Sequence, residues 1–245
     1  MNLSNVANLM NGKLKNEDLD SYAVFVKIGN EEKTIYSNNV NGDTLFDIAS
    51  CGKVLITTPL ILRAIGEGLI SLETTLAQLF DEVPDDKKNI TVKQLLTHTS
   101  GIVRYEFPNG MDVRHEMVTK DILSKPLAYV PGSNYRYSCH GMLLLGFILE
   151  KIYGESLENL FEKYHRSWLD YTRSKFNMEH NESNSVVCYK IPTADHLEHP
   201  WDDENVRVLK TTAGSGGQAF SLNDINEMKT HLITELIGRV GKELH

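Results

Sequence analysis

A serine and a lysine three positions apart, Ser50 and Lys53, are the residues of this chain best suited to chemistry. If a helix begins at Ser50, the two side chains lie on the same face, one turn apart. A serine hydroxyl is a poor nucleophile until a base takes its proton, and a lysine in its neutral form can be that base. Taken by themselves, these residues favour a helix N-cap serine followed by a solvated lysine. The rest of the chain has to decide between the two interpretations.

The segments around this pair predict the elements that must position it. Residues 22–36 contain two β-rich runs around a Gly-Asn pair, which is typical of a hairpin, and residues 44–48 form an extended segment that leads to Ser50. The apolar run that follows Lys53 predicts a buried central helix ending near Gly66 or Gly68. We also expect a first helix within residues 1–20, helices over 120–127, 140–154 and 156–169, a strand over 186–191 and a last helix from residue 221.

Composition excludes several classes of partner. The chain has 245 residues and a net charge of -8, so nucleic acid is not an expected partner. Its first residues contain no continuous apolar run, so we expect neither a signal peptide nor a membrane segment. Three widely spaced cysteines, Cys51, Cys139 and Cys188, indicate neither a disulfide framework nor a metal site. A reducing cytoplasm is the expected location, although a secreted protein trimmed of its leader would look the same.

Four stretches together resemble the serine β-lactamases and penicillin-binding proteins, within them the class C β-lactamase-like branch. That branch includes D-Ala-D-Ala carboxypeptidases and esterases. The stretches occur in the family's order and are FDIASCGKV, ITVKQLLTHTSGI, YVPGSNYRYSCHGMLLLGFILEKIYG and AGSGGQAFSLNDINEM. The first resembles the nucleophile box and the third the tyrosine box.

The resemblance implies a role for each matching residue. Ser50 matches the acylated serine, Lys53 its lysine partner, and Tyr137 the tyrosine that relays the proton to the leaving group. Cys139, Gly216 and Gly217 occupy positions that contact substrate in the family. No metal and no organic cofactor is implied, and the partner is a small-molecule substrate.

Four other residues near these motifs receive structural interpretations. His98 lies in a segment that forms a structural corner in the family, so we expect a buried, hydrogen-bonded histidine. His140 is expected to cap or line its helix. Cys51 and Cys139 are expected to be reduced small core residues, although their neighbouring positions would allow them to approach one another.

Two departures from the family pattern weaken the expectation of full activity. The tyrosine box ends in asparagine in the family, where it helps to hold the substrate and the lysine, but here it ends in Cys139, whose thiol hydrogen-bonds weakly. The family's third motif, Lys-Thr-Gly or His-x-Gly on a later strand, has no match here. Residues 210–214 (KTTAG) resemble it superficially but stand before the glycine-rich segment.

We therefore expect an α+β fold of one β-lactamase-like domain over residues 1–245. Residues 1–49 and 186–245 would form a side with a small antiparallel sheet, covered by the first and last helices, and residues 50–185 a helical lobe. The sheet is expected to be incomplete, leaving the hairpin as a two-stranded ribbon with an open edge that permits self-association. The chain would be a short or divergent member, a fragment, or one that completes its sheet with another chain.

Two functions remain open at this point. The first is a serine hydrolase that acts through an acyl-enzyme on a small amide, ester or β-lactam. The alternative is a catalytically impaired β-lactamase-like module with a binding or regulatory role.

Overall fold

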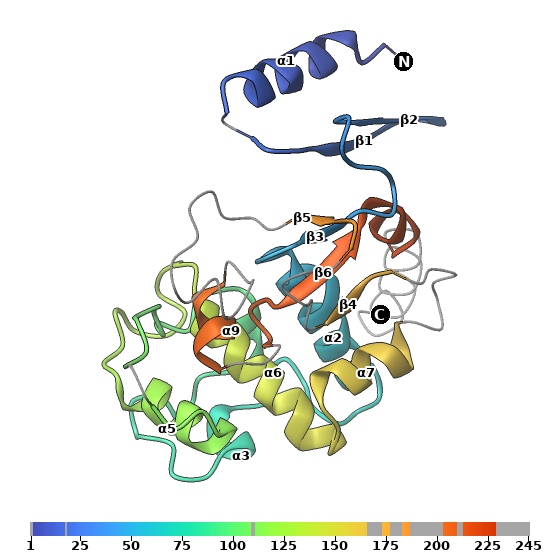
Figure 1. Ribbon diagram of the computed structural model, residues 1–245. Coiled ribbons are helices and arrows are strands. Elements are labelled where there is room, and N and C mark those ends of the chain that lie inside the picture. Colours follow the sequence, from blue (N-terminus) through green and yellow to red (C-terminus); the bar gives the residue numbers. More distant parts are fainter. Residues whose placement is uncertain are drawn as a thin grey trace.

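A small sheet and a long apolar helix form the centre of the molecule (Figure 1). The computed structural model describes residues 2–17, 19–108, 111–165, 173–176, 183–186, 203–209 and 213–228. Within these residues helices and short strands are mixed, and the expected α+β fold class is confirmed. The expected strand beyond residue 186, most of the last helix, Cys188 and residues 210–212 lie outside the described residues.

The central sheet has four strands in the order β4-β6-β3-β5. Their bounds are β3 Leu45–Asp47, β4 Lys175–Phe176, β5 Ser185–Val186 and β6 Gln218–Ser221. β6 pairs antiparallel with both β3 and β4, whereas β5 runs parallel to β3. One pair therefore departs from the antiparallel sheet that was expected. Asn184, just before β5, extends this pairing, because its carbonyl accepts from Leu45 N at 2.9 Å.

The helix after Ser50 begins with a π-helical turn, η1 (Lys53–Thr57), and continues as α2 (Thr58–Gly66). Its end near Gly66 confirms the prediction, and Gly68 then takes a left-handed φ of +72°. Further helices among the described residues are α3 Leu76–Leu79, α4 Val92–Leu96, α5 His115–Ser124, α6 Cys139–Tyr153, α7 Leu157–Tyr164 and α9 Glu204–Leu209, and residues 222–228 are also helical. α5 starts five residues earlier than expected, and α9 was not predicted.

α6 packs at the centre because it is apolar on all sides. Residues 139–149 are all buried. Ser138 caps its start by accepting from Gly141 N at 3.1 Å, and Gly154 ends it in a left-handed conformation. α4 packs against α6 and begins with a capping box of Thr91 and Gln94.

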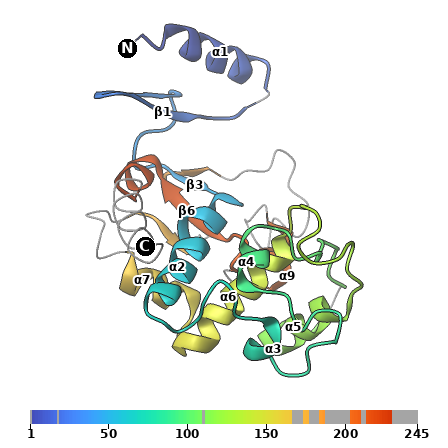
Figure 2. The ribbon, with the colours of Figure 1, turned by 180° about the vertical axis from the view of Figure 1, so that it is seen from behind.

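The hairpin forms a layer of its own, with the first helix beside it (Figures 1 and 2). β1 (Ala23–Ile28) and β2 (Glu31–Tyr36) pair antiparallel and, among the described residues, make a separate two-stranded sheet, as predicted. α1 (Ser4–Lys15) lies beside the hairpin, where Tyr22 donates to Asn11 Oδ1 at 2.9 Å. The first helix was expected to cover the small sheet together with the last helix. It lies beside the hairpin instead, and the hairpin is not part of the four-stranded sheet, so this expectation was wrong.

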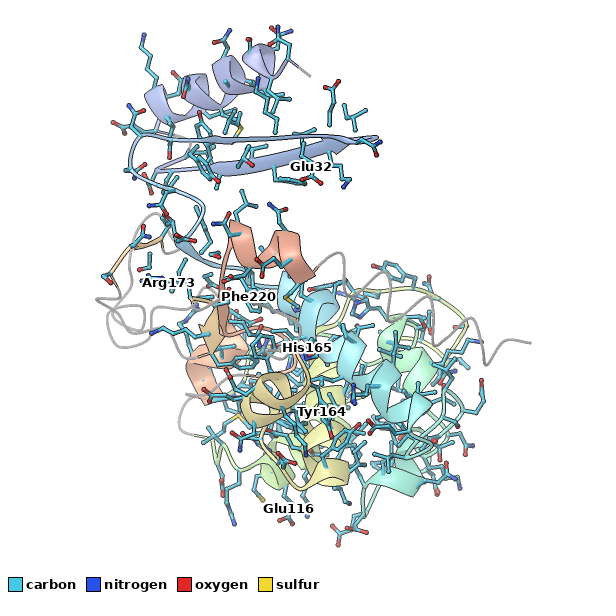
Figure 3. The ribbon with its side chains drawn as sticks, turned by 90° about the vertical axis from the view of Figure 1, so that its right-hand side faces the viewer. Glu32, Glu116, Tyr164, His165, Arg173 and Phe220 are labelled. Atoms are coloured by element: carbon cyan, nitrogen blue, oxygen red, sulfur yellow. The ribbon has the colours of Figure 1, made fainter. Side chains whose placement is uncertain are left out.

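Aromatic residues join the helices to the central sheet. Phe161 of α7 packs edge-on against Phe220 of β6, with ring centroids 5.6 Å apart, and stacks on His165. Figure 3 shows Phe220 and His165 in the body of the molecule, with Glu32 on the hairpin and Glu116 at the opposite end. The apolar core thus includes residues of β3 and β6 and of the Ser50 helix, and it holds the start of that helix against the sheet.

Candidate active site

Ser50 stands in a tight turn between β3 and the central helix. Asp47 Oδ1 accepts from Ala49 N at 2.8 Å, and Ile48 O accepts from Cys51 N at 2.9 Å. Ala49 has a φ of +44°, a left-handed conformation that is unfavourable for a residue with a Cβ. The turn therefore presents the serine at the helix N-terminus. Among the described residues no acceptor takes the Ser50 N–H.

Lys53 is buried at 3% exposure and directs its amine nitrogen at the serine. Its Nζ donates to Ser50 Oγ at 2.8 Å and to the carbonyl oxygen of Ser215 at 2.6 Å. The expectation that Ser50 and Lys53 share a face is confirmed. A buried amine without hydrogen bonds would be costly, and these two acceptors reduce that cost.

Tyr137 completes a cluster of three side chains around the Ser50 hydroxyl. Its hydroxyl donates to Ser50 Oγ at 2.8 Å, and its ring centroid lies 5.3 Å from Lys53 Nζ. Ser50 Oγ is therefore within hydrogen-bond distance of both partners that the sequence suggested. Tyr137 is 44% exposed, so the reacting side of the cluster is open to solvent.

His98 supports the Tyr137 segment rather than touching Ser50. Its carbonyl accepts from Arg136 N at 3.0 Å, and its Nδ1 accepts from Ser138 N at 3.3 Å, so it holds the residue on each side of Tyr137. Its backbone has a φ of +55° and its ring lies 4.7 Å from the tyrosine ring. Burial, and then the nearby Lys53 charge, lower the pKa of His98, which favours the neutral acceptor form. His98 is hydrogen-bonded, as expected, but its ring is half-buried rather than buried.

Cys51 and Cys139 occupy different environments. Cys139 is buried at 5% exposure as the first residue of α6, whereas Cys51 is exposed. Both are free thiols. The expectation of two core cysteines was therefore wrong for Cys51, because it lies on the outer side of the first helical turn. A substrate contact for Cys139 stays a prediction.

The glycine-rich turn of residues 213–217 lies beside Lys53. Ala213 and Gly216 exchange backbone hydrogen bonds, and Gly217 has a φ of +91° that suits glycine. Gly214 O accepts from Thr57 Oγ1 at 2.8 Å. The turn thus borders the site, while substrate binding by Gly216 and Gly217 stays a prediction.

Two contributors to the site escaped the sequence reasoning. The Ser215 carbonyl holds Lys53, but a backbone acceptor has no side-chain signature in a sequence. Gln218 lies fully buried beside the turn, and a polar residue directly before the apolar pair Ala219 and Phe220 was the available signal.

His140 does not contribute to this cluster. It is fully buried within α6 and stacks on Tyr105, with ring centroids 4.4 Å apart. Neither ring nitrogen has a hydrogen-bond partner among the described residues. His140 is therefore a buried residue of α6 and not part of the site, as its structural interpretation predicted.

Within the described residues, no group of three or more His, Cys, Asp or Glu side chains is arranged to hold a metal ion. No helix in that part of the chain is long and apolar enough to cross a membrane.

Comparison with known proteins places the chain in a family. The family model described as Beta-lactamase matches residues 8–227. The chain therefore belongs to the Beta-lactamase family, and the resemblance seen in the sequence is confirmed.

Individual relatives agree with this assignment. The chain is 30% identical over 213 residues to a protein of Escherichia coli O157:H7 named "Putative D-alanyl-D-alanine carboxypeptidase", covering 74% of this chain and 49% of that protein. It is 27% identical over 135 residues to Esterase EstB of Burkholderia gladioli, covering 47% of this chain and 34% of the esterase. The curated relatives it matches are longer, and the chain spans about a third to about a half of their length.

Solved structures show the same fold at low sequence identity. A crystal structure titled as a β-lactamase/D-alanine carboxypeptidase from Pseudomonas syringae superposes with a TM-score of 0.72 at 16% identity, covering 93% of this chain and 64% of the other. A structure titled as a class C β-lactamase superposes with a TM-score of 0.74 at 18% identity, covering 92% and 62%.

Proposed function

We propose that this protein is a serine hydrolase that forms an acyl-enzyme at Ser50. The observation that carries the proposal is that Ser50 Oγ lies 2.8 Å from both Lys53 Nζ and the Tyr137 hydroxyl. Nucleophilic catalysis by serine needs an adjacent base within this distance. Membership of the Beta-lactamase family and relatives named as carboxypeptidase and esterase support the same reaction class.

In the acylation step Ser50 Oγ attacks the carbonyl carbon of the substrate. Its proton passes to Lys53 or Tyr137, whichever is in its basic form, and the carbonyl oxygen becomes an oxyanion near the Ser50 N–H. Collapse of the intermediate breaks the bond to the leaving group, which takes the proton from the same pair. An ester then links the acyl group to Ser50.

In the deacylation step water attacks the acyl carbon and gives a proton to Tyr137 or Lys53. The ester bond breaks, Ser50 Oγ takes a proton back, and the acid product leaves. The net reaction is hydrolysis of a small amide, ester or β-lactam. Neither step draws on a metal or an organic cofactor.

The alternative is a module of the same fold that binds without turnover. Cys139 favours this alternative because its buried thiol cannot supply the hydrogen bonds that an asparagine would give to substrate and lysine. Against it, the Ser215 carbonyl already holds Lys53 next to the serine.

Intact-mass spectrometry after incubation with a fluorophosphonate or a penicillin separates the two functions. The hydrolase is expected to gain one adduct mass, and Ser50→Ala, tested under the same conditions, is expected to gain none. A folded protein that gains no adduct from either probe would refute the hydrolase and leave the binding module. A chromogenic ester or cephalosporin then measures turnover.

A further inference from the structure

Gln218 closes the glycine-rich turn from the inside. It is the first residue of β6 and is fully buried. Its Nε2 donates to Ala213 O at 3.1 Å and to Gly216 O at 2.8 Å. Both partners are carbonyl oxygens, which only accept, so the amide nitrogen must face them. The side chain therefore joins the two ends of the turn that contains Ser215.

The same residue contacts the nucleophile turn on both sides of Ser50. Its backbone carbonyl accepts from Ile48 N at 3.1 Å. Its Oε1 lies against Gly52, where an added Cβ would be 1.9 Å away. A residue with a side chain at position 52 would have to displace this amide. Gln218 thus touches the residue two before Ser50 and the residue two after it.

Through these contacts one residue connects the nucleophile turn with the acceptor of the lysine partner. The turn that Gln218 closes presents Ser215 O to Lys53 Nζ at 2.6 Å and Gly214 O to Thr57 Oγ1 at 2.8 Å. The direction of the Lys53 amine therefore depends on the shape of this turn.

We propose that Gln218 is a positioning residue for Ser50 and Lys53. It fixes the 213–217 turn so that the Ser215 carbonyl directs Lys53 Nζ at Ser50 Oγ. This inference rests on the proposed function for its effect on acylation, but its effect on Lys53 geometry can be observed in an inactive protein as well. Gln218 does not touch the reacting atoms and is not a catalytic residue.

A purely space-filling role predicts a different result from a positioning role. Methionine has nearly the shape of glutamine but cannot donate to Ala213 O and Gly216 O. If Gln218 only fills space, Gln218→Met behaves like the wild type. If it fixes the turn, Gln218→Met folds but loses the alignment of Lys53, because small errors in position cost large factors in rate.

The kinetic test follows labelling of Ser50 by a fluorophosphonate and separates the maximal inactivation rate from the half-saturating concentration. For Gln218→Met we expect the rate to fall by about tenfold or more, with the half-saturating concentration within about twofold of wild type. Gln78→Met is the control for the substitution itself, because Gln78 is exposed and accepts its hydrogen bonds from Thr75 rather than from a residue of the site. An unchanged rate in Gln218→Met would overturn the inference.

A spectroscopic test works whether or not the protein is acylated. In protein labelled with ¹³C-lysine, the Lys53 Cε resonance is assigned by its loss in Lys53→Arg. Gln218→Met is expected to move this resonance, and Gln78→Met to leave it unchanged. A Lys53 resonance that Gln218→Met does not move would contradict the positioning role. If the wild-type protein is not labelled but Gln218→Met still moves the Lys53 resonance, the proposed function is refuted and the positioning role stands.

A second variant covers the case in which Gln218→Met does not fold. In Gly52→Ala/Gln218→Ala the new methyl group at position 52 occupies space that the amide leaves. This double variant is expected to be more stable than Gly52→Ala and to move the Lys53 resonance. A wild-type resonance and labelling rate in the folded double variant would overturn the inference.

Discussion

The hydroxyl groups of Tyr137 and Ser50 lie 2.8 Å apart, although the two residues are 87 positions apart in the chain. His98 brings them together by hydrogen-bonding the backbone of the residues on both sides of Tyr137. The position of the tyrosine thus depends on a corner contributed by a third segment.

We predict that Tyr137→Phe slows acylation of Ser50 by on the order of a hundredfold or more, because it removes a proton-transferring group and leaves the ring packing intact. The rate of fluorophosphonate labelling is the measurement. Tyr135→Phe is the control, since Tyr135 is 63% exposed and its ring packs edge-on against His98. Equal rates for the two variants would exclude Tyr137 from proton transfer.

Gly214→Ala should strongly destabilise the fold. A Cβ at Gly214 would lie 2.2 Å from Met142 O of α6, so the turn and the helix would have to separate. We expect a loss of about 3 kcal/mol in the free energy of unfolding, as for an overpacked core. Urea denaturation gives this value.

Gly12→Ala is the matched control for that variant. Gly12 lies within α1, and an added Cβ there meets nothing within 4 Å. Alanine is the better helix former by ~0.5–1 kcal/mol, so this variant should be slightly more stable. A Gly214→Ala protein as stable as wild type would show that the turn does not pack on α6 as described.

Stability is expected to fall in mild acid because of His140. Burial, reinforced by Arg104, lowers the pKa of His140 to about 4, while Asp203 and Asp121 act in the opposite direction. The unfolded chain takes up this proton near pH ~6.5 and the folded chain only near pH 4. The contribution is therefore present above pH ~6.5 and is lost as the pH falls through 4, by roughly 3 kcal/mol.

Denaturation series between pH 7 and pH 4 test this prediction. His140→Phe keeps a ring that can stack on Tyr105 and removes the titrating group. The variant should lose less stability than wild type over this interval. Parallel pH profiles for the two proteins would mean that His140 does not cause the acid sensitivity.

Self-association through the hairpin stays a prediction. Among the described residues β1 and β2 pair only with one another, and a two-stranded ribbon is marginal by itself. Ile28 at the end of β1 is 66% exposed. Light scattering over a concentration series should show association in wild type and less in Ile28→Lys, where the added charge opposes edge pairing. A monomer at all concentrations would count against it.

The sequence determined the elements whose causes are local. The hairpin around Gly29, the capping box of Thr91 and Gln94, and the left-handed end of α6 at Gly154 follow from turn and cap chemistry within a few residues. The spacing of Ser50 and Lys53 placed them on one face for the same reason. Motif order added Tyr137, since the family resemblance spans segments that local rules cannot connect.

Tertiary structure decided what depends on contacts between distant segments. The start of α5, the exposure of Cys51, and the separate hairpin sheet are set by which surfaces meet, and local patterns carry little of that information. The acceptor of Lys53 is a backbone carbonyl 162 positions away, and any residue has such a group. Gln218 became part of the site only when β6 paired with β3, because that pairing places its side chain against Gly52.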